Sequence, residues 1–461
     1  MTENLVGISG SSMSSQEEIL VVGGTYDGGI IGLSLKPYLS KNKKFESKKV
    51  ECIEEVAKDD MDEEINKEKN SGVNGIFDMV FAFKAHIASI KDMDSKGNIL
   101  VTASTDETMR IYNLKTRCDS GMLTKHQGSV TYVCLSWNYK YLISCGEDKV
   151  VCIWRCSNWD PIKSFDDIHD CIPISADFHP SLKLALTLDI EGNICMLNLI
   201  EGNLAAKFTV PGMKKNGQHL NRRYGLFTLV KFNISGTYYA VLSQRELIIS
   251  NITDEEDWYL SSSITDFGVG PSQITSFCWI TNQIFLVGFS NGLIRILQVT
   301  KQCLINLEIT FTVSKTTSDE IKNPHLGNRI KGICIIGYNH LKDENLGNSN
   351  ICGKLVTCDS SGIFVLFNFK LKLNKEIGNS LCELEIMDIF DSDNRITCMA
   401  IEDKSPIDPL SLFLPSTNQE NSDSKVDKGC LSSTPTKGNK KLRVIKKSKL
   451  DNSKKKDNLK Q

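Results

Sequence analysis

Seven histidines are the residues of this sequence that could perform acid–base or metal chemistry. They are His86, His126, His169, His179, His219, His325 and His340. The last three have no Cys, Asp or His at the spacing of a metal site. The sequence contains no HExxH, GxSxG or GxxxxGK(S/T) motif and no paired-carboxylate motif, so nothing favours a metalloenzyme, a hydrolase or a nucleotidase. We therefore expect no catalytic, metal-binding or cofactor-binding residue and no enzyme. A catalytic site assembled from distant parts of the chain is the alternative.

The 16 cysteines are scattered along the chain and form no CxxC pair. Cys152 and Cys156 are close in sequence but too far apart along an extended strand to share a disulfide or a metal. Scattered cysteines within strands ordinarily behave as small buried apolar residues in a reducing compartment. The N-terminus lacks a signal-peptide pattern, and no apolar run approaches the length of about 18 residues that could span a membrane. We expect a protein of the cytosol or nucleus without membrane attachment.

The net charge of −2 hides a strong asymmetry. Residues 437–461 hold eleven Lys or Arg and two Asp, a charge of +9, which leaves −11 on the rest of the chain. This tail is either a solubilising terminus or a nuclear and nucleolar address that contacts RNA phosphates. It has no aromatic residue, so any RNA contact would be electrostatic. The residues that would make the contact are Lys440, Lys441, Arg443, Lys446, Lys447, Lys449, Lys454, Lys455 and Lys456.

A repeated pattern indicates which elements carry the histidines. "TASTDETMRIYNL" at 102–114 and "SCGEDKVVCIWRC" at 144–156 share one arrangement of apolar run, polar turn and second apolar run. Related hairpins recur along the chain, most of them flanked by a further apolar run on each side. Four strands at a period of about 40–45 residues are typical of a propeller blade. We predict an all-β, seven-bladed propeller, with a six-bladed ring as the alternative.

The first of these units has only three strands. We predict that "RITCMAIED" at 395–403 enters it as the innermost strand and closes the ring, which removes two free sheet edges. The expected domains are an N-terminal extension at 1–18, the propeller at 19–403, a polar linker at 404–436 and a disordered basic tail at 437–461. A charged insertion at 41–70 interrupts the first blade. Its acidic part, 51–64, is a solvated loop or a dock for basic proteins. Long loops are expected at 312–328 and 339–350.

Residues 83–117, "FKAHIASIKDMDSKGNILVTASTDETMRIYNLKTR", resemble a WD40 repeat, although no Trp-Asp pair is present. They are similar in particular to the second repeat of the p21-activated-kinase-interacting-protein family. The first unit, "VVGGTYDGGIIGLSL", is also similar to the opening of that family. The resemblance covers residues 19–403 and is weaker from 240 to 390.

WD40 repeats contain a hydrogen-bonded set made of a His before the first strand, a Ser or Thr, a turn Asp and a Trp. The resemblance implies that His86, Thr102, Asp106 and Tyr112 form this set in the second blade, and that His126, Ser144, Asp148 and Trp154 form it in the third. The fourth blade retains His169 and Thr187 but has Glu191 and Leu197 at the Asp and Trp places. The later blades are expected to lack the His.

The resemblance also implies a function. Yeast-type members of the family are nucleolar factors for assembly of the large (60S) ribosomal subunit. The expected role is a non-catalytic scaffold in the nucleolus that binds assembly factors and ribosomal proteins, as a monomer within a larger complex. The alternative is an adaptor that binds and restrains a p21-activated-type protein kinase.

Overall fold

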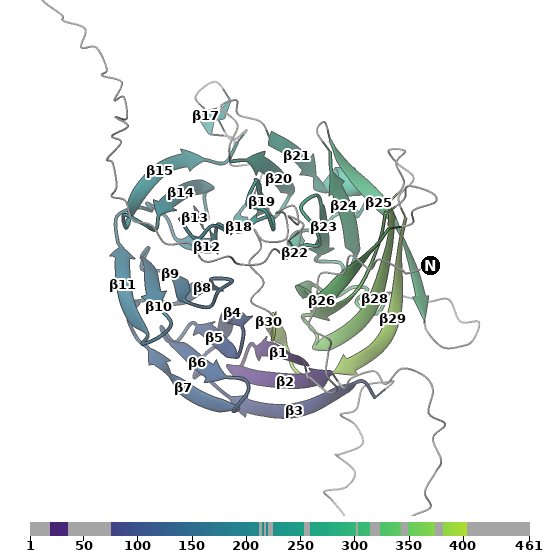
Figure 1. Cartoon of the computed structure of the whole chain (residues 1–461), viewed down its shortest axis with the longest axis horizontal. Helices are drawn as coiled ribbons and strands as arrows, with labels where there is room; N and C mark the ends of the chain where they lie inside the picture. The colour runs from purple at the N-terminus through teal and green to yellow at the C-terminus, as the bar shows by residue number, and fades with distance from the viewer. Residues whose placement is uncertain are drawn as a thin grey trace, which may run out of the picture. The chain divides into compact units, whose positions relative to one another are not determined.

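The strands form seven four-stranded antiparallel blades around a common centre (Figure 1). The computed structural model describes residues 19–35, 75–211, 214–215, 218–219, 225–252, 259–300, 303–313, 323–342, 349–373 and 381–402. This architecture confirms the predicted all-β propeller and its count of seven blades. The segments predicted at 1–18, 41–70, 404–436 and 437–461 lie outside the described residues.

The four strands of each blade run in order from the inner to the outer edge. Blade 1 comprises β30 (Ile396–Ile401), β1 (Ile19–Thr25), β2 (Gly29–Leu35) and β3 (Phe77–Lys84), and blade 2 comprises β4 (Ile90–Lys96), β5 (Ile99–Ser104), β6 (Met109–Asn113) and β7 (Cys118–Leu123). Blade 3 comprises β8 (Val130–Leu135), β9 (Tyr141–Gly146), β10 (Val151–Arg155) and β11 (Asp160–Phe165). Blade 4 comprises β12 (Pro173–Phe178), β13 (Leu184–Asp189), β14 (Asn193–Asn198) and β15 (Asn203–Thr209). Blade 5 comprises β18 (Phe227–Phe232), β19 (Tyr238–Ser243), β20 (Glu246–Asn251) and β21 (Tyr259–Ser263). Blade 6 comprises β22 (Ile274–Trp279), β23 (Ile284–Phe289), β24 (Ile294–Val299) and β25 (Leu304–Val313). Blade 7 comprises β26 (Ile330–Lys342), β27 (Ser349–Asp359), β28 (Ile363–Leu373) and β29 (Leu381–Asp391). The hairpin β16 (Lys214–Lys215) and β17 (Gln218–His219) and the 3-10 helix η2 (Ile264–Phe267) lie between blades in the sequence.

Strand β30 closes the ring as predicted. It pairs antiparallel with β1, with Val22 opposite Ala400 and Gly23 opposite Met399. Blade 1 therefore contains strands from both ends of the described chain (Figure 1). The inner edge of β1, which would otherwise be open for pairing with other chains, is thereby covered.

The second strand of each blade is apolar on both faces because both faces pack against neighbouring blades. On β9, Ile143 packs with residues of blade 4, whereas Leu142 packs with residues of blade 2. The described apolar residues form seven such clusters, one between each pair of adjacent blades. Burial of one such side chain contributes roughly 1.5–3 kcal/mol, so the interfaces between blades supply the core.

Carboxylates on inner strands also join neighbouring blades. Asp92 on β4 accepts the backbone N–H of Val133 on β8 at 3.1 Å. Asp94 accepts the N–H of Leu135 at 2.7 Å. A carboxylate on β12 does the same for β18 at 2.8 Å. These bonds satisfy N–H groups on the inner edge of a blade, where no further strand of that blade is available.

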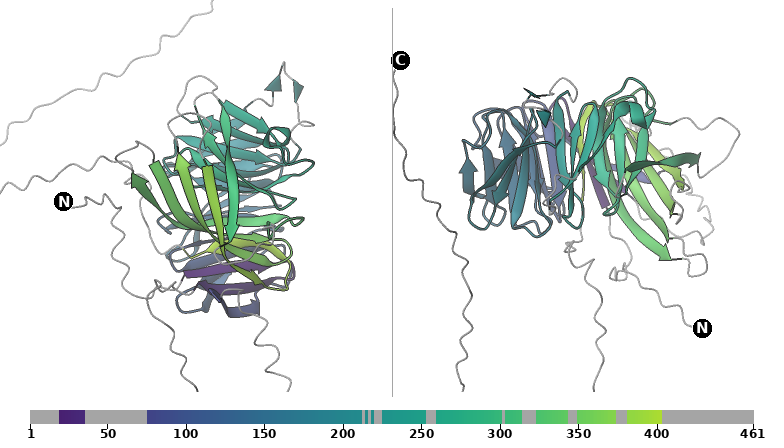
Figure 2. Two further views of the ribbon diagram at one scale, coloured as in Figure 1. Left: turned by 90° about the vertical axis from the view of Figure 1, so that its right-hand side faces the viewer. Right: turned by 90° about the horizontal axis from the view of Figure 1, so that it is seen from above.

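Blades 6 and 7 depart from the sequence prediction. Residues 339–342 and 349–350, expected in a loop, extend β26 and β27, and pairing continues until Lys342 lies opposite Ser349. β25 then pairs in parallel with β29, which joins the two blades into one eight-stranded sheet. Figure 2 shows these long strands splaying outward from the other blades. The sequence reason is the period-two pattern of β28, in which Phe367, Phe369 and Leu371 are buried and the residues between them are polar.

Candidate functional site

The hydrogen-bonded set of blade 3 connects the Trp154 indole to the Asp148 carboxylate through Ser144 and His126. Trp154 Nε1–H donates to Ser144 Oγ at 2.9 Å. The Ser144 hydroxyl lies 2.8 Å from His126 Nε2, and His126 Nδ1 lies 3.0 Å from Asp148 Oδ2. Because the carboxylate only accepts, His126 Nδ1 carries a proton and donates it to Asp148. The set connects the loop before β8, strand β9 and the β9–β10 turn.

Blade 2 brings together three of its four predicted residues. His86 Nδ1 lies 3.0 Å from Asp106 Oδ2, and His86 Nε2 lies 2.8 Å from Thr102 Oγ1. Tyr112 packs edge-on against Phe83, with ring centroids 5.6 Å apart. Burial lowers the pKa of His86, and the nearby Asp106 carboxylate only partly offsets this effect.

The blade 4 set uses a different carboxylate from the one expected. His169 Nε2 lies 2.7 Å from Thr187 Oγ1, but His169 Nδ1 faces Asp189 Oδ2 at 3.4 Å rather than Glu191. Asp189 also accepts the backbone N–H groups of Glu191 and Asn193. The carboxylate has moved two residues earlier in the turn and still reaches the imidazole.

The expectation that later blades lack the His was wrong for blade 7. His325 Nδ1 lies 2.8 Å from Asp359 Oδ2, and His325 Nε2 lies 2.6 Å from Thr357 Oγ1. All three residues are fully buried. His325 precedes Thr357 by 32 residues, whereas His126 precedes Ser144 by 18. The interval is longer because β26 and β27 are long, so the sequence spacing did not reveal the pair.

A short motif could have revealed both unexpected carboxylates. "TLDIEG" at 187–192 and "TCDSSG" at 357–362 share the pattern Thr-x-Asp-x-x-Gly. The final glycines, Gly192 and Gly362, have positive φ angles of 88° and 110°. Blades 2 and 3 place Glu107 and Lys149 at the same point of the turn, with φ of 67° and 66°. A non-glycine residue is strained in this conformation.

The electrostatics of the sets fit a structural role. Burial alone would raise the pKa of Asp359, but hydrogen bonds from His325 and Ser361 outweigh it and keep that pKa below its ordinary value. Asp106 and Asp189 also have lowered pKa values because hydrogen bonds to their carboxylates outweigh burial. The four histidines are buried and already bonded at both nitrogens. We infer that these sets fix the turns.

His179 also bonds within a turn. Its Nδ1 lies 2.7 Å from Ser181 Oγ, and its Nε2 lies 3.2 Å from the carbonyl oxygen of Gly236 in the next blade. The side chains of His219 and His340 lie outside the described residues. The same is true of the nine lysines and arginines of the tail that were predicted to contact RNA.

The loops that carry the sets lie on one face of the ring, here called the loop face. In a four-stranded antiparallel blade, the turn between the second and third strands and the connection to the next blade lie at the same end. Among the described residues of these loops, four large apolar side chains are exposed: Tyr26 at 54%, Ile87 at 88%, Leu226 at 50% and Leu326 at 62%. Exposed apolar side chains on stiff loops are typical of protein–protein contacts.

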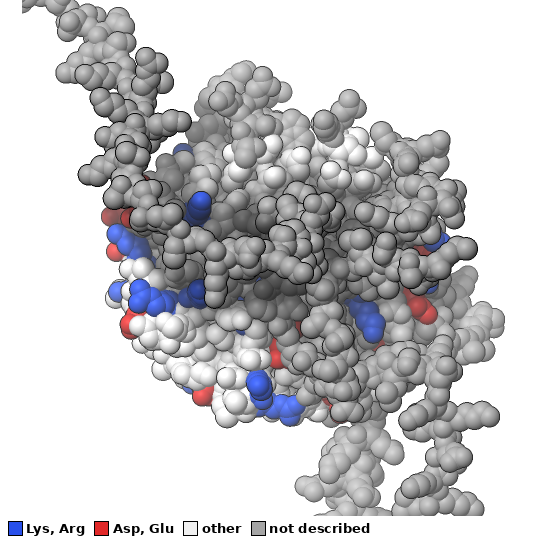
Figure 3. Space-filling view, viewed as in Figure 1, with Lys and Arg blue, Asp and Glu red and all other residues white. Residues whose placement is uncertain are grey.

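The loop face also contains a hollow of about 630 Å³ between blades 5, 6 and 7. Arg245 and Arg329 line it together with polar residues that include Thr265 and Ser290. Arg329 Nη2–H donates to Gln273 Oε1 at 3.3 Å. Glu246 also lines the hollow, so its charged groups are of both signs. Around the outer rim of the ring, the described basic and acidic side chains are interspersed in the view of Figure 3.

No group of His, Cys, Asp or Glu that could hold a metal ion occurs among the described residues. Over the same residues, no helix has the length and apolar character needed to cross a membrane.

Comparisons with known proteins agree with the geometry of the blades. The family model "WD domain, G-beta repeat" matches residues 77–113 and 118–155, which cover β3 to β6 and β7 to β10. WD40 propellers are typically non-catalytic scaffolds.

Three curated relatives are similar to this chain over part of its length. A p21-activated protein kinase-interacting protein 1-like of Gallus gallus is 26% identical over 325 residues, which cover 70% of this chain and 72% of that protein. The corresponding protein of Danio rerio is 28% identical over 48% of this chain and 54% of its own length. Protein MAK11 of Saccharomyces cerevisiae is 29% identical over 40% of this chain and 45% of its own length. The chain is therefore a WD40-repeat protein related to the p21-activated protein kinase-interacting protein 1-like proteins and to protein MAK11.

Proposed function

We propose that this chain is a non-catalytic scaffold in nucleolar assembly of the large ribosomal subunit and in rRNA processing. The observation that carries the proposal is the similarity to MAK11 and to the p21-activated protein kinase-interacting protein 1-like proteins. Residues 83–117 resemble a family whose yeast-type members do this work. The partners are ribosome assembly factors and ribosomal proteins, and the location is the nucleolus and nucleus.

The loop face is the surface on which a scaffold of this kind would hold its partners. Four hydrogen-bonded sets fix its turns, so a partner that docks there orders few side chains or loops on binding. Ile87 and Leu326 are its most exposed apolar residues. The basic tail at 437–461 adds a salt-sensitive, sequence-independent contact with rRNA and a nuclear address.

Affinity purification of the tagged full chain at low salt tests this function, with bound proteins identified and bound RNA probed for precursor rRNA. We expect large-subunit assembly factors and precursor rRNA with the wild-type chain, and a clear loss with Ile87→Glu combined with Leu326→Glu. Ile200→Glu is the matched control, because Ile200 is 73% exposed in the β14–β15 turn at the opposite end of its blade. Absence of precursor rRNA from the wild-type preparation would overturn the proposal.

The second candidate is an adaptor that binds and negatively regulates a p21-activated-type protein kinase. The observation that favours it is the name of the relatives from Gallus gallus and Danio rerio, which are described as kinase-interacting. Kinase activity in the same purified preparations, measured with and without added chain, distinguishes the two. Inhibition by the wild-type chain without precursor rRNA would support the adaptor.

A further inference from the structure

The outer strand of blade 1 exposes aromatic and apolar side chains where charged ones are ordinarily found. β3 is the terminal strand of its sheet among the described residues. Phe83 is 44% exposed and Met79 is 37% exposed. Soluble proteins ordinarily blunt such an edge with charges or cover it, and a contiguous exposed apolar surface marks an interaction site.

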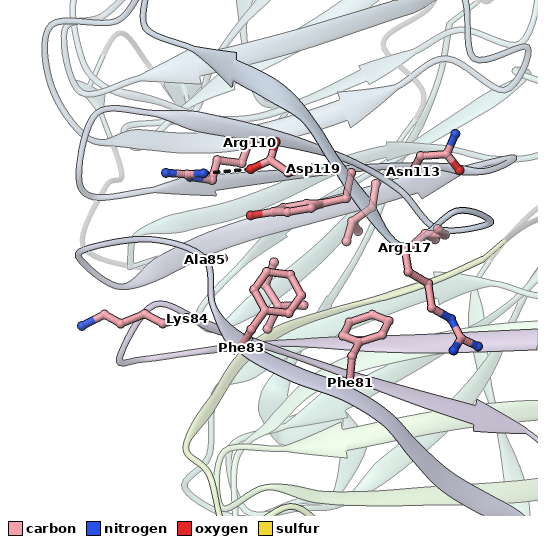
Figure 4. Close-up of a pocket in the computed structure, with 12 residues that line it drawn as sticks. Phe81, Phe83, Lys84, Ala85, Arg110, Asn113, Arg117 and Asp119 are labelled. Carbon is pink, nitrogen blue, oxygen red and sulfur yellow. Dashed lines mark hydrogen bonds and ion pairs between the residues drawn. The ribbon is translucent and has the colours of Figure 1, made fainter.

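Phe83 and its neighbour Phe81 form one wall of a groove between blades 1 and 2, here called the rim groove. Phe81 and Phe83 lie 5.8 Å apart between ring centroids, and Phe83 meets Tyr112 of blade 2 edge-on at 5.6 Å (Figure 4). The groove has a volume of about 450 Å³ and is lined mainly by apolar residues. Phe81 lies directly on Gly32 of β2, where an added Cβ would be 2.2 Å from the phenyl ring. The missing side chain at Gly32 thus leaves Phe81 lying against the sheet rather than across the groove.

The polar rim of the groove is mainly basic. Lys84, Arg110 and Arg117 line it against a single carboxylate, Asp119. Arg110 Nη1 pairs with Asp119 Oδ2 at 2.9 Å, with both side chains partly exposed. Figure 4 shows Lys84 at one end of the row of phenyl rings and Arg117 at the other. A ligand that lies along the row therefore meets a cation at each end.

We propose that the rim groove binds an extended acidic segment of a partner protein through one aromatic or leucine side chain. The anchor side chain enters the groove against the paired rings of Phe83 and Tyr112, and carboxylates on either side of it meet Lys84 and Arg117. The backbone of the segment runs along the outer edge of β3, whose N–H and C=O groups can pair with an added strand. The surface is on the side of the ring, so the inference does not depend on the proposed ribosomal function.

An RNA base could also stack on aromatic rings beside an arginine. The apolar lining offers few hydrogen-bond partners for a base, whereas the outer edge of β3 offers backbone groups that pair with a peptide as an added strand. The observations therefore favour a peptide over RNA.

Selection of a random 12-residue peptide library, displayed on phage, against the purified full chain tests the inference. The probes for affinity measurement are the enriched peptides with a fluorescent label and a labelled 12-nucleotide oligouridine. Phe83→Ser removes the anchor wall, and Lys84→Glu reverses an exposed charge at the rim without touching the core. Ile162→Ser is the matched control, because Ile162 is 45% exposed on β11, the outer strand of blade 3.

We expect the enriched peptides to be acidic and to contain a conserved aromatic residue or leucine. Phe83→Ser should weaken their binding by about tenfold or more, and Lys84→Glu by about fivefold with an effect that shrinks at high salt. Ile162→Ser should leave the affinity unchanged. Failure to enrich peptides, enrichment of basic or unanchored ones, or equal binding by Phe83→Ser would overturn the inference. Binding of oligouridine that is lost in both groove variants would replace the peptide with RNA.

Discussion

Removal of the Asp359 carboxylate is the most informative single change in the ring. Asp359 Oδ2 accepts from His325 Nδ1–H at 2.8 Å. Its Oδ1 accepts from the backbone and the hydroxyl of Ser361, at 2.9 and 2.6 Å, and from the N–H groups of Gly362 and Ile363, both at 3.2 Å. Asp359→Ala would therefore remove the acceptor of several donors around a carboxylate that is itself fully buried.

The loss of unfolding free energy in Asp359→Ala follows from the number of donors that lose their acceptor. Each buried donor left without a partner costs about 1–3 kcal/mol, and the change removes the acceptor of the His325 imidazole and of three turn amides. We expect Asp359→Ala to lower the free energy of unfolding by about 4 kcal/mol. Asp106→Ala should cost about 2 kcal/mol, because the Asp106 side chain is 13% exposed and water can replace part of what is lost. Asp359→Asn should cost less than Asp359→Ala, because its carbonyl oxygen still accepts from the turn although its NH2 group faces the His325 N–H.

Equilibrium urea denaturation of the full chain, followed by tryptophan fluorescence, measures these differences. Hydrogen exchange of peptides that cover 357–366 shows whether the loss begins in the β27–β28 turn. Asp27→Ala is the control, because Asp27 is an exposed aspartate in the corresponding turn of blade 1. The reasoning is refuted if Asp359→Ala stays within about 1 kcal/mol of the wild type or costs no more than Asp106→Ala.

Three further changes test other parts of the ring. Lys149→Gly should stabilise the chain by about 0.5–1 kcal/mol in urea denaturation, because Lys149 has a φ of 66°; Lys149→Ala, which keeps the strain, should not. Burial raises the pKa of Asp92 from 3.8 to about 7. Between these two pH values the folded state binds more protons than the unfolded state, so the contribution of Asp92 to stability falls as the pH rises. Asp92→Asn should therefore raise the Tm at pH 8 and have little effect near pH 4; an equal effect at both would contradict the shift. Ending the chain after Asn394 removes β30 and should abolish cooperative thermal unfolding, whereas ending it after Lys404 should not; equal melting curves would show that β30 is dispensable.

The sequence is most informative where each strand obeys a local rule. Apolar runs around polar turns predict the hairpins, because a blade packed on both sides requires apolar residues on both faces of its middle strands. The three-stranded first unit and the surplus strand near residue 396 together predict the closure of the ring.

Other features depend on distances in space that sequence spacing does not encode. His325 and Thr357 are separated by the long strands β26 and β27, so their contact has no fixed sequence interval. Asp189 and Asp359 reach their histidines from a turn position two residues before the one used in blades 2 and 3. The bonds from Asp92 and Asp94 to the next blade depend on how closely adjacent inner strands approach.

The rim groove also arises only when two blades are placed side by side. Phe81 and Phe83 read in sequence as ordinary alternating residues of a strand, and Tyr112 reads as a substitute for tryptophan. Their meeting at the edge of the ring requires β3 to be the outermost strand of blade 1 and to pack beside blade 2. The pattern that predicts the strand does not predict which of its faces remains exposed.

Sedimentation of the tagged chain from cell lysate on a density gradient at low salt tests the ribosomal scaffold function most directly. Each fraction is probed for the chain and for precursor rRNA of the large subunit. We predict that the wild-type chain migrates with large-subunit precursor particles and that raising the salt releases a chain lacking 437–461 more readily than the full chain. Migration of the full chain as a free protein or a small protein complex, without precursor rRNA, would contradict this function.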